Sequence, residues 1–178
     1  MNARRPILVA MLAATTAMVS CSSPQVSFYA NERPVLELDQ YFNGRVMAHG
    51  VFQKRNGEVS QRFVVEMDCQ WTGNEGVLDE TFTYSDGKTQ RRVWRITKHE
   101  NGRYTGVADD VVGQASGQTS GNAFRWNYTL RLPVDDKEYE VQFDDWMYLV
   151  DDEVMINRAT MSKFGFALGE VLLSFRKE

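Results

Sequence analysis

The stretch from residue 63 to residue 71, FVVEMDCQW, decides the fold class because apolar and polar side chains alternate along it. Its odd-numbered residues are all apolar, and its even-numbered residues are polar except for Val64. Alternation with a period of two predicts a β-strand with one buried and one solvated face. Residues 124–132, FRWNYTLRL, repeat the pattern. The chain is therefore expected to be built from half-buried strands.

Turn signals separate such segments about every ten residues. Asn56-Gly57, Asp86-Gly87 and Asn101-Gly102 are examples, and these residue pairs supply the positive φ that tight hairpins need. Regular spacing of strands and hairpin turns predicts an antiparallel meander. The expected strands are 45–54, 59–71, 77–85, 90–98, 103–108, 112–120, 123–132, 138–148, 153–163 and 170–176.

A meander of this length leaves exposed sheet edges unless it closes on itself. Closure predicts an all-β, antiparallel up-and-down barrel of about 8–10 strands, wide enough for side chains or one small ligand. The segment 35–42 after Pro34 predicts a short helical turn before the first strand. A barrel that spans the outer membrane is the alternative, but segments such as 90–98 carry too many arginines for a lipid-facing wall.

The N-terminus carries export signals. Arg4 and Arg5 precede an apolar run over residues 7–19, which is too short for a membrane-spanning helix and typical of a signal peptide. The sequence MVSC at residues 18–21 resembles the lipobox of bacterial lipoproteins. It implies cleavage after residue 20 and lipidation of Cys21. Residues 22–33 are polar and include Pro24, so residues 21–33 are expected to form a tether before a single barrel domain over 34–178. An ordinary secretory peptide is the alternative.

Composition excludes several classes of function. The 178 residues include 43% hydrophobic and 12% aromatic residues, which is typical of a globular domain. A net charge of −4 argues against binding to nucleic acid. Two Cys and two His are too few for a disulfide scaffold or a zinc site with several protein ligands, and Cys69 is expected to be a buried, inert thiol. No phosphate-binding, dinucleotide or nucleophile motif occurs, so neither a cofactor nor a metal is expected.

Charged residues share strand faces with large apolar side chains at four positions, which are Glu80, Arg92, Asp144 and Arg158. If these faces line the interior, burial requires the charges to pair, for example Glu80 with Arg92 across adjacent strands. Such a pair has two interpretations: a structural ion pair, or a polar clamp for the head group of an apolar ligand. The expected wall residues of the ligand site are Trp94, Trp126 and Tyr128.

Glycines at 113, 117 and 121 are spaced by four and so share one face of a strand. A face without bulk permits sharp bending, close approach of another segment, or room for a ligand. The sequence leaves these alternatives open.

Longer strings resemble a known family. They are LDETFTYSDG at 78–87 with RVW at 92–94, DDWMYL at 144–149, INRATMSKFG at 156–165, the segment 113–128, and the ending over 169–175. Together with the lipobox they resemble the bacterial lipoprotein family called domain of unknown function 3833. The resemblance covers about residues 30–178 and implies a lipocalin-like, calycin-type barrel. The genes of such proteins often neighbour those of lipid-modifying enzymes, which implies a fatty-acyl ligand.

The function expected from these observations is ligand binding by a lipid-anchored protein of the bacterial envelope. Anchoring through Cys21 places it at a membrane, and Ser22 after the lipidated residue implies the outer membrane, facing the periplasm. The expected ligand is an apolar small molecule such as a fatty-acyl lipid. An enzyme that uses Glu80 or Asp144 on modified acyl chains is one alternative. A structural protein with a filled barrel is another.

Overall fold

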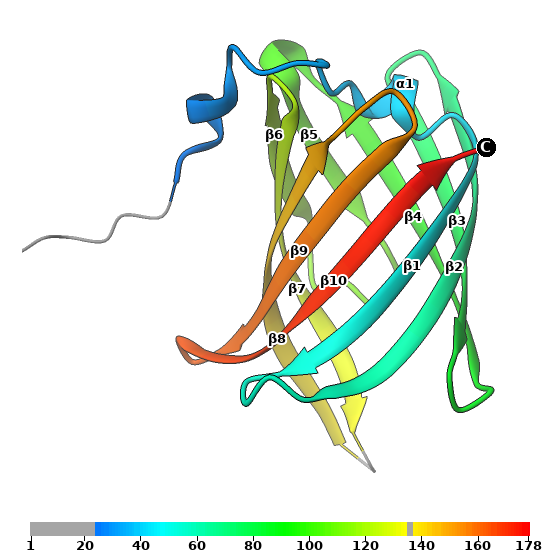
Figure 1. Ribbon diagram of the computed structural model, residues 1–178, viewed down its shortest axis with the longest axis vertical. Helices are drawn as coiled ribbons and strands as arrows, with labels where there is room; N and C mark the ends of the chain where they lie inside the picture. The colour runs from blue at the N-terminus through cyan, green and yellow to red at the C-terminus, as the bar shows by residue number, and fades with distance from the viewer. Residues whose placement is uncertain (1–23, 135–136) are drawn as a thin grey trace, which may run out of the picture.

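The computed structural model describes residues 24–134 and 137–178, which form a closed antiparallel barrel (Figure 1). In the described residues ten strands follow one another around the barrel in chain order, and the last pairs with the first. They are β1 (Gly44–Lys54), β2 (Val59–Thr72), β3 (Glu75–Tyr84), β4 (Thr89–Lys98), β5 (Arg103–Val107), β6 (Ala115–Ser120), β7 (Ala123–Val134), β8 (Lys137–Leu149), β9 (Val154–Lys163) and β10 (Phe166–Lys177). The predicted up-and-down barrel is confirmed.

Hairpin turns fall where the sequence predicts them. Gly57 and Gly87 adopt φ values of +88° and +84° in the turns that follow β1 and β3. Such values are unfavourable for residues with a Cβ atom, so the Asn-Gly and Asp-Gly pairs are suited to these turns. Most strand boundaries lie within two residues of the prediction, and the largest differences are that β6 begins at 115 rather than 112 and β10 begins at 166 rather than 170.

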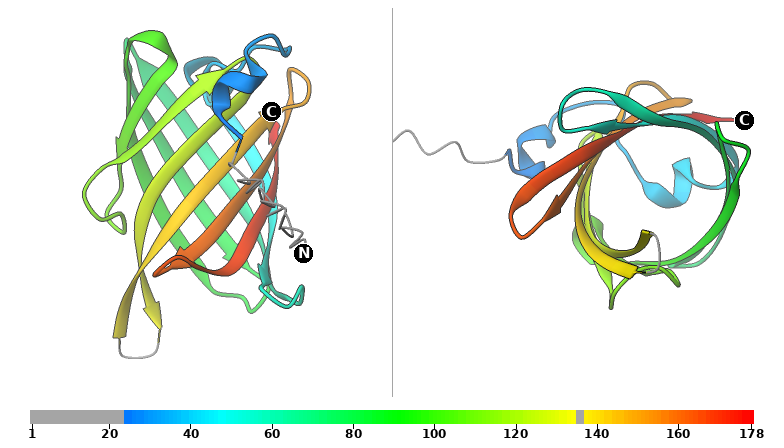
Figure 2. Two further views of the ribbon diagram at one scale, coloured as in Figure 1. Left: turned by 90° about the vertical axis from the view of Figure 1, so that its left-hand side faces the viewer. Right: turned by 90° about the horizontal axis from the view of Figure 1, so that it is seen from below.

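One end of the barrel is closed by the short helix α1 (Leu38–Tyr41), which lies inside the ring of strands (Figure 2). The predicted helical turn is therefore confirmed. Four apolar side chains in and next to α1 are buried, which are Leu36, Leu38, Tyr41 and Phe42. The Trp71 indole N–H on β2 donates to the Phe42 carbonyl at 2.8 Å. Lys98 on β4 contacts Glu37 at 2.8 Å and Asp39 at 2.7 Å, and so holds the polar side of α1 at the barrel rim.

The wall is irregular where β5 and β6 are short. β5 pairs with residues 95–98 of β4, and β6 pairs with residues 123–127 of β7. The loop 108–114 continues along β7, where Val111 pairs with Leu130 and the Arg131 amide donates to the Asp110 carbonyl at 2.8 Å. This loop therefore completes the wall next to the first half of β4, and its side chains can reach the interior.

The segment before the barrel lies against the outer wall. The 3-10 helix η1 (Val26–Tyr29) places the Tyr29 ring 6.0 Å from Trp146 and 5.3 Å from Tyr148. From Pro24 onward, the predicted tether is thus partly docked on β8. A second 3-10 turn, η2 (Glu100–Gly102), links β4 to β5. Across the part of the chain that the structure describes, no helix has the length and apolar character to cross a membrane.

Candidate functional site

The barrel encloses a cavity of about 920 Å³, which extends from α1 toward the opposite end. Leu38 of α1 and Phe42 directly after it close the cavity at one end, and Phe52, Tyr84 and Leu132 line it near the opposite end. Most of the wall is aliphatic or aromatic. The volume lies well above the roughly 300 Å³ that is the lower bound for small-molecule sites. The alternative of a barrel filled by its own side chains is therefore wrong.

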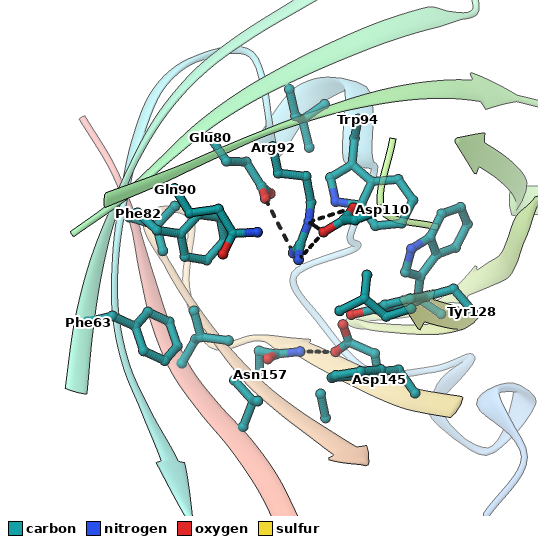
Figure 3. Close-up of a pocket in the computed structure, with 18 of the residues that line it drawn as sticks. Phe63, Glu80, Phe82, Gln90, Arg92, Trp94, Asp110, Tyr128, Asp145 and Asn157 are labelled. Atoms are coloured by element: carbon teal, nitrogen blue, oxygen red, sulfur yellow. Dashed lines mark hydrogen bonds and ion pairs between the residues drawn. The ribbon is translucent and has the colours of Figure 1, made fainter. Parts of the chain in front are cut away.

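A polar cluster lies inside this apolar space (Figure 3). The Arg92 guanidinium donates from Nε to Asp110 Oδ2 at 2.9 Å, and its Nη2 lies 2.8 Å from the same oxygen. Its Nη1 lies 3.9 Å from Glu80 Oε2. Glu80 and Arg92 are direct partners in the pairing of β3 with β4, so the predicted pair across adjacent strands is confirmed. Asp110 reaches the cluster from the loop 108–114.

A second polar pair faces the cluster from β8 and β9 (Figure 3). The Asn157 amide donates to Asp145 Oδ1 and, at 3.2 Å, to the Trp146 carbonyl. Asp145 and Asn157 are both buried, and both line the cavity. The cavity thus has polar groups on two opposing parts of an otherwise apolar wall.

Burial changes the acidity of these groups. Removal from water raises the pKa of Glu80 to about 7, and the nearby Arg92 only partly opposes this. Burial likewise raises the pKa of Asp145 to about 7, against the hydrogen bond from Asn157. Burial acts to lower the pKa of Arg92, but the charges of Glu80 and Asp110 more than compensate and keep it protonated. The cluster therefore contains one permanent cation and two carboxyls that titrate near neutrality.

The three predicted wall residues all line the cavity. Trp94 packs edge-on against Trp126 and Tyr128, with ring centroids 5.7 Å and 5.4 Å apart. The Tyr128 ring stacks on Phe143 at 4.9 Å, and burial raises the pKa of its hydroxyl well above 10. Neutral aromatic rings therefore surround the charged cluster.

The predicted shared face of the three glycines is wrong, because Gly113 and Gly121 lie outside β6 and only Gly117 lies within it. A Cβ atom at Gly117 would overlap the Trp126 ring and the Arg125 carbonyl, and one at Gly121 would overlap the Tyr29 carbonyl. Gly117 thus lets the Trp126 ring pack flat against the wall, and Gly121 lets the N-terminal segment approach. Of the alternatives left open by the sequence, close approach of other groups explains these two positions.

Two predicted interior residues lie outside, so this part of the prediction is wrong. Asp144 faces outward and accepts a hydrogen bond from Arg125 at 2.7 Å, and Arg158 faces outward and pairs with Glu170. The cause is the direction of the β8 side chains. Trp146 and Tyr148 share a face with Asp144 but are covered on the outside by Tyr29. Large aromatic side chains are thus not a sign of the interior here.

Sequence reasoning also missed Asp110, Asp145 and Asn157. The signal for Asp145 was present, because Val141, Phe143, Met147 and Leu149 alternate with it as regularly as the aromatic residues alternate with Asp144. Asn157 is adjacent to Arg158 in the sequence. Assigning the opposite face of this strand to the interior would therefore also have identified Asn157. No local signal marks Asp110, because it lies in a loop.

Other predicted features have separate outcomes. Cys69 is buried, and burial together with the nearby charge of Glu80 raises the pKa of its thiol to about 12, as expected for an inert cysteine. Cys21 and the signal peptide over residues 1–20 lie outside the described residues. Within the described ranges, no cluster of His, Cys, Asp and Glu side chains could hold a metal ion.

The family described as Protein of unknown function (DUF3833) matches residues 15–177. The chain belongs to this family. The resemblance seen in the sequence is thus confirmed. No curated protein matches the chain.

Among solved structures, the S-type phycobiliprotein lyase CPES from Guillardia theta is similar in fold. Its TM-score is 0.60 at 6% sequence identity, over 87% of this chain and 98% of the lyase. A de novo designed fluorescence-activating β-barrel gives a TM-score of 0.43 at 14% identity, over 80% of this chain and 99% of the design. The likeness to the lyase supports the lipocalin-like barrel fold predicted from the sequence.

Proposed function

We propose that this protein is a membrane-anchored lipoprotein that binds one apolar small molecule, such as a fatty-acyl lipid, inside its barrel. The cavity of about 920 Å³, apolar along most of its wall and polar at the Arg92 cluster, carries the proposal. Ligand sites commonly combine apolar walls with a few convergent polar groups. Each CH₂ group of a chain that enters such a space contributes about 0.8 kcal/mol.

The closed end gives the ligand a direction. Leu38 and Phe42 block the α1 end, so the acyl chain of the ligand enters from the end that carries the turns after β1, β3 and β9. Arg131 and Glu138 line the cavity near that end and are exposed to solvent. The apolar part of the ligand lies along the aromatic wall, and its polar part contacts the cluster around Arg92.

The lipobox supports the proposed location. A lipid on Cys21 anchors the mature chain at a membrane through its acyl chains. Ser22 after the lipidated cysteine supports the outer membrane, facing the periplasm. We expect that Cys21→Ser moves the protein from the membrane fraction to the soluble periplasmic fraction. Continued retention in the membrane fraction would overturn lipid anchoring.

The binding test uses the purified protein. Mass spectrometry of its extracted lipids is expected to show a bound acyl lipid in near-stoichiometric amount, and a fluorescent fatty-acyl probe is expected to bind saturably. Ala159 is buried on β9 and lines the cavity, so Ala159→Trp fills the space. This variant is expected to bind the probe at least about tenfold more weakly, a loss of about 1.4 kcal/mol.

Ala167→Trp is the matched control because Ala167 is exposed on β10 and does not line the cavity. It is expected to bind the probe as the wild type does. Circular dichroism checks that both variants fold, since overfilling a packed wall destabilises proteins. Absence of a co-purifying lipid together with absence of probe binding would overturn the proposed function.

A further inference from the structure

Within the residues that the structure describes, the polar patch in the cavity contains two hydrogen-bond acceptors that have no donor. In the described chain, Glu80 Oε2 and Asn157 Oδ1 are buried side-chain acceptors of the cavity wall without a hydrogen-bond partner. Their residues are 9% and 1% exposed. A buried polar atom without a partner destabilises the folded state, so native structures rarely contain one. Both atoms are acceptors, and both need a donor.

Most donors of the patch are already in use, although Nη1 of Arg92 lies 3.9 Å from Glu80 Oε2 and makes no hydrogen bond to any residue that the structure describes. Arg92 directs Nε and Nη2 at Asp110, at 2.9 Å and 2.8 Å. The Asn157 amide nitrogen donates to Asp145 and to the Trp146 carbonyl. A ligand that only accepts hydrogen bonds can reach Nη1 of Arg92, but it leaves both free acceptors of the patch without a donor.

The charges around the patch also favour a ligand without negative charge, because carboxyls outnumber cations there. Among the described residues, Glu80, Asp110 and Asp145 face the single guanidinium of Arg92 across this part of the cavity (Figure 3). Asp109, Arg131 and Glu138 also line the cavity, but they are exposed to solvent, which screens them. An anionic head group would add a negative charge beside carboxyls, and such like-charge contacts weaken binding.

We infer that the ligand carries a head group that donates hydrogen bonds and bears no negative charge, such as a hydroxyl or an ammonium group. This inference rests on the proposed function and narrows it to a class of ligand. Donation to Glu80 Oε2 and Asn157 Oδ1 satisfies both free acceptors at once. A cationic donor also balances the excess of carboxyls. A free fatty acid, whose carboxylate is an acceptor with negative charge, belongs to the class that the site disfavours.

The test compares three probes with the same twelve-carbon chain, which are dodecylamine, dodecanol and dodecanoic acid. Affinities are measured on the purified protein by displacement of the fluorescent probe at pH 8, where Glu80 and Asp145, whose pKa values are both about 7, are mostly ionised. The tighter of the amine and the alcohol is expected to bind at least about tenfold more tightly than the acid.

The outcomes separate this inference from the proposed function. If the acid binds as tightly as the amine and the alcohol, or more tightly, the inference is overturned and the proposed function stands. If none of the three compounds displaces the fluorescent probe, the inference is overturned, whereas the proposed function is overturned only if the fluorescent probe itself does not bind and no lipid co-purifies. If a donor probe binds more tightly than the acid, both are supported.

A variant locates the selectivity. Glu80→Gln replaces a charged acceptor with an amide that also donates, so the preference for the amine over the acid is expected to fall at least about tenfold. Glu170→Gln is the matched control because Glu170 is part of an ion pair on the outer face, and its preference is expected to equal that of the wild type. If the two variants have the same preference, Glu80 is not the selecting group. Should Glu80→Gln fail to fold, the series on the wild-type protein still tests the inference.

Discussion

The β3–β4 hairpin carries two ion pairs on opposite faces of the same wall. Asp79 and Arg91 pair at 2.6 Å on the outside, with side chains 34% and 68% exposed. Glu80 and Arg92, their neighbours in sequence, lie 3.9 Å apart on the inside, with side chains 11% and 15% exposed. Two carboxylate–arginine pairs one position apart therefore lie in two different environments, the solvent and the barrel interior.

The two carboxyls respond in opposite directions. Hydrogen bonds from Arg91 lower the pKa of Asp79, whereas burial raises the pKa of Glu80 to about 7. β8 repeats the contrast. Burial acts to raise the pKa of Asp144, but hydrogen bonds from Arg125 and Asn127 hold it below its usual value. On the inner face, burial raises the pKa of Asp145 to about 7. The face of the wall, and not the residue type, decides the chemistry of each carboxyl.

Removal of the inner cation is expected to have the largest effect. Arg92→Met leaves Asp110 and Glu80 in the interior without a partner charge, and loss of one member of a buried pair costs about 3–5 kcal/mol. Arg91→Met removes the outer cation, whose ion pair is screened by solvent, so its loss should be much smaller. Urea unfolding of both variants measures the difference in unfolding free energy. Equal losses would show that the two faces are energetically alike.

The inner carboxyls predict a dependence of stability on pH. The groups that face Glu80 are Arg92 of β4, Asp110 of the loop and Asp145 of β8, with Asp79 next to it on β3. Because the folded pKa of Glu80 is about 7 and its ordinary value is 4.5, the folded state holds a proton that the unfolded chain releases. The unfolding free energy should therefore fall as the pH rises from 4.5 to 7, by about 2–3 kcal/mol for this group.

Glu80→Gln removes this contribution, so its unfolding free energy should fall less between pH 5 and pH 8 than that of the wild type. The slope due to Asp145 remains, since its pKa is also about 7. Asp79→Asn is the control on the outer face and should leave the slope over this range as in the wild type. A wild-type curve that is flat or rises between pH 5 and pH 8 would contradict the raised pKa values.

The smallest effect is expected for the outer pair of β9 and β10. Arg158 has a side chain that is 61% exposed, and its ion pair with Glu170 contributes about 0–1 kcal/mol. Arg158→Gln should therefore change the unfolding free energy by less than about 1 kcal/mol and leave probe binding unchanged. Reduced probe binding in this variant would show that Arg158 contributes to the ligand site, as predicted from the sequence.

Much of the barrel was predictable because its signals are local. The alternation over 63–71 and the turns at Asn56-Gly57 and Asp86-Gly87 each depend on a few neighbouring residues. The pairing of Glu80 with Arg92 was also predictable, since a tight turn between adjacent strands sets their register. The β8 side chains were assigned to the wrong faces because two alternating apolar series run through the same strand, and Asp144 and Asp145 each belong to one of them.

The sequence by itself thus determined the strands, their order around an antiparallel meander and one buried ion pair, because side-chain alternation and turn chemistry act over short distances. Only the tertiary structure decided which face of β8 is the inside. Tyr29, more than a hundred residues earlier, covers Trp146 and Tyr148 on the outside. Closure of the barrel also brought Asp110, Asp145 and Asn157 to the cavity that Arg92 faces. Local alternation can place Asp145 and Asn157 on a strand face, but it does not specify that they meet Arg92 and Asp110, which lie on distant segments of the chain.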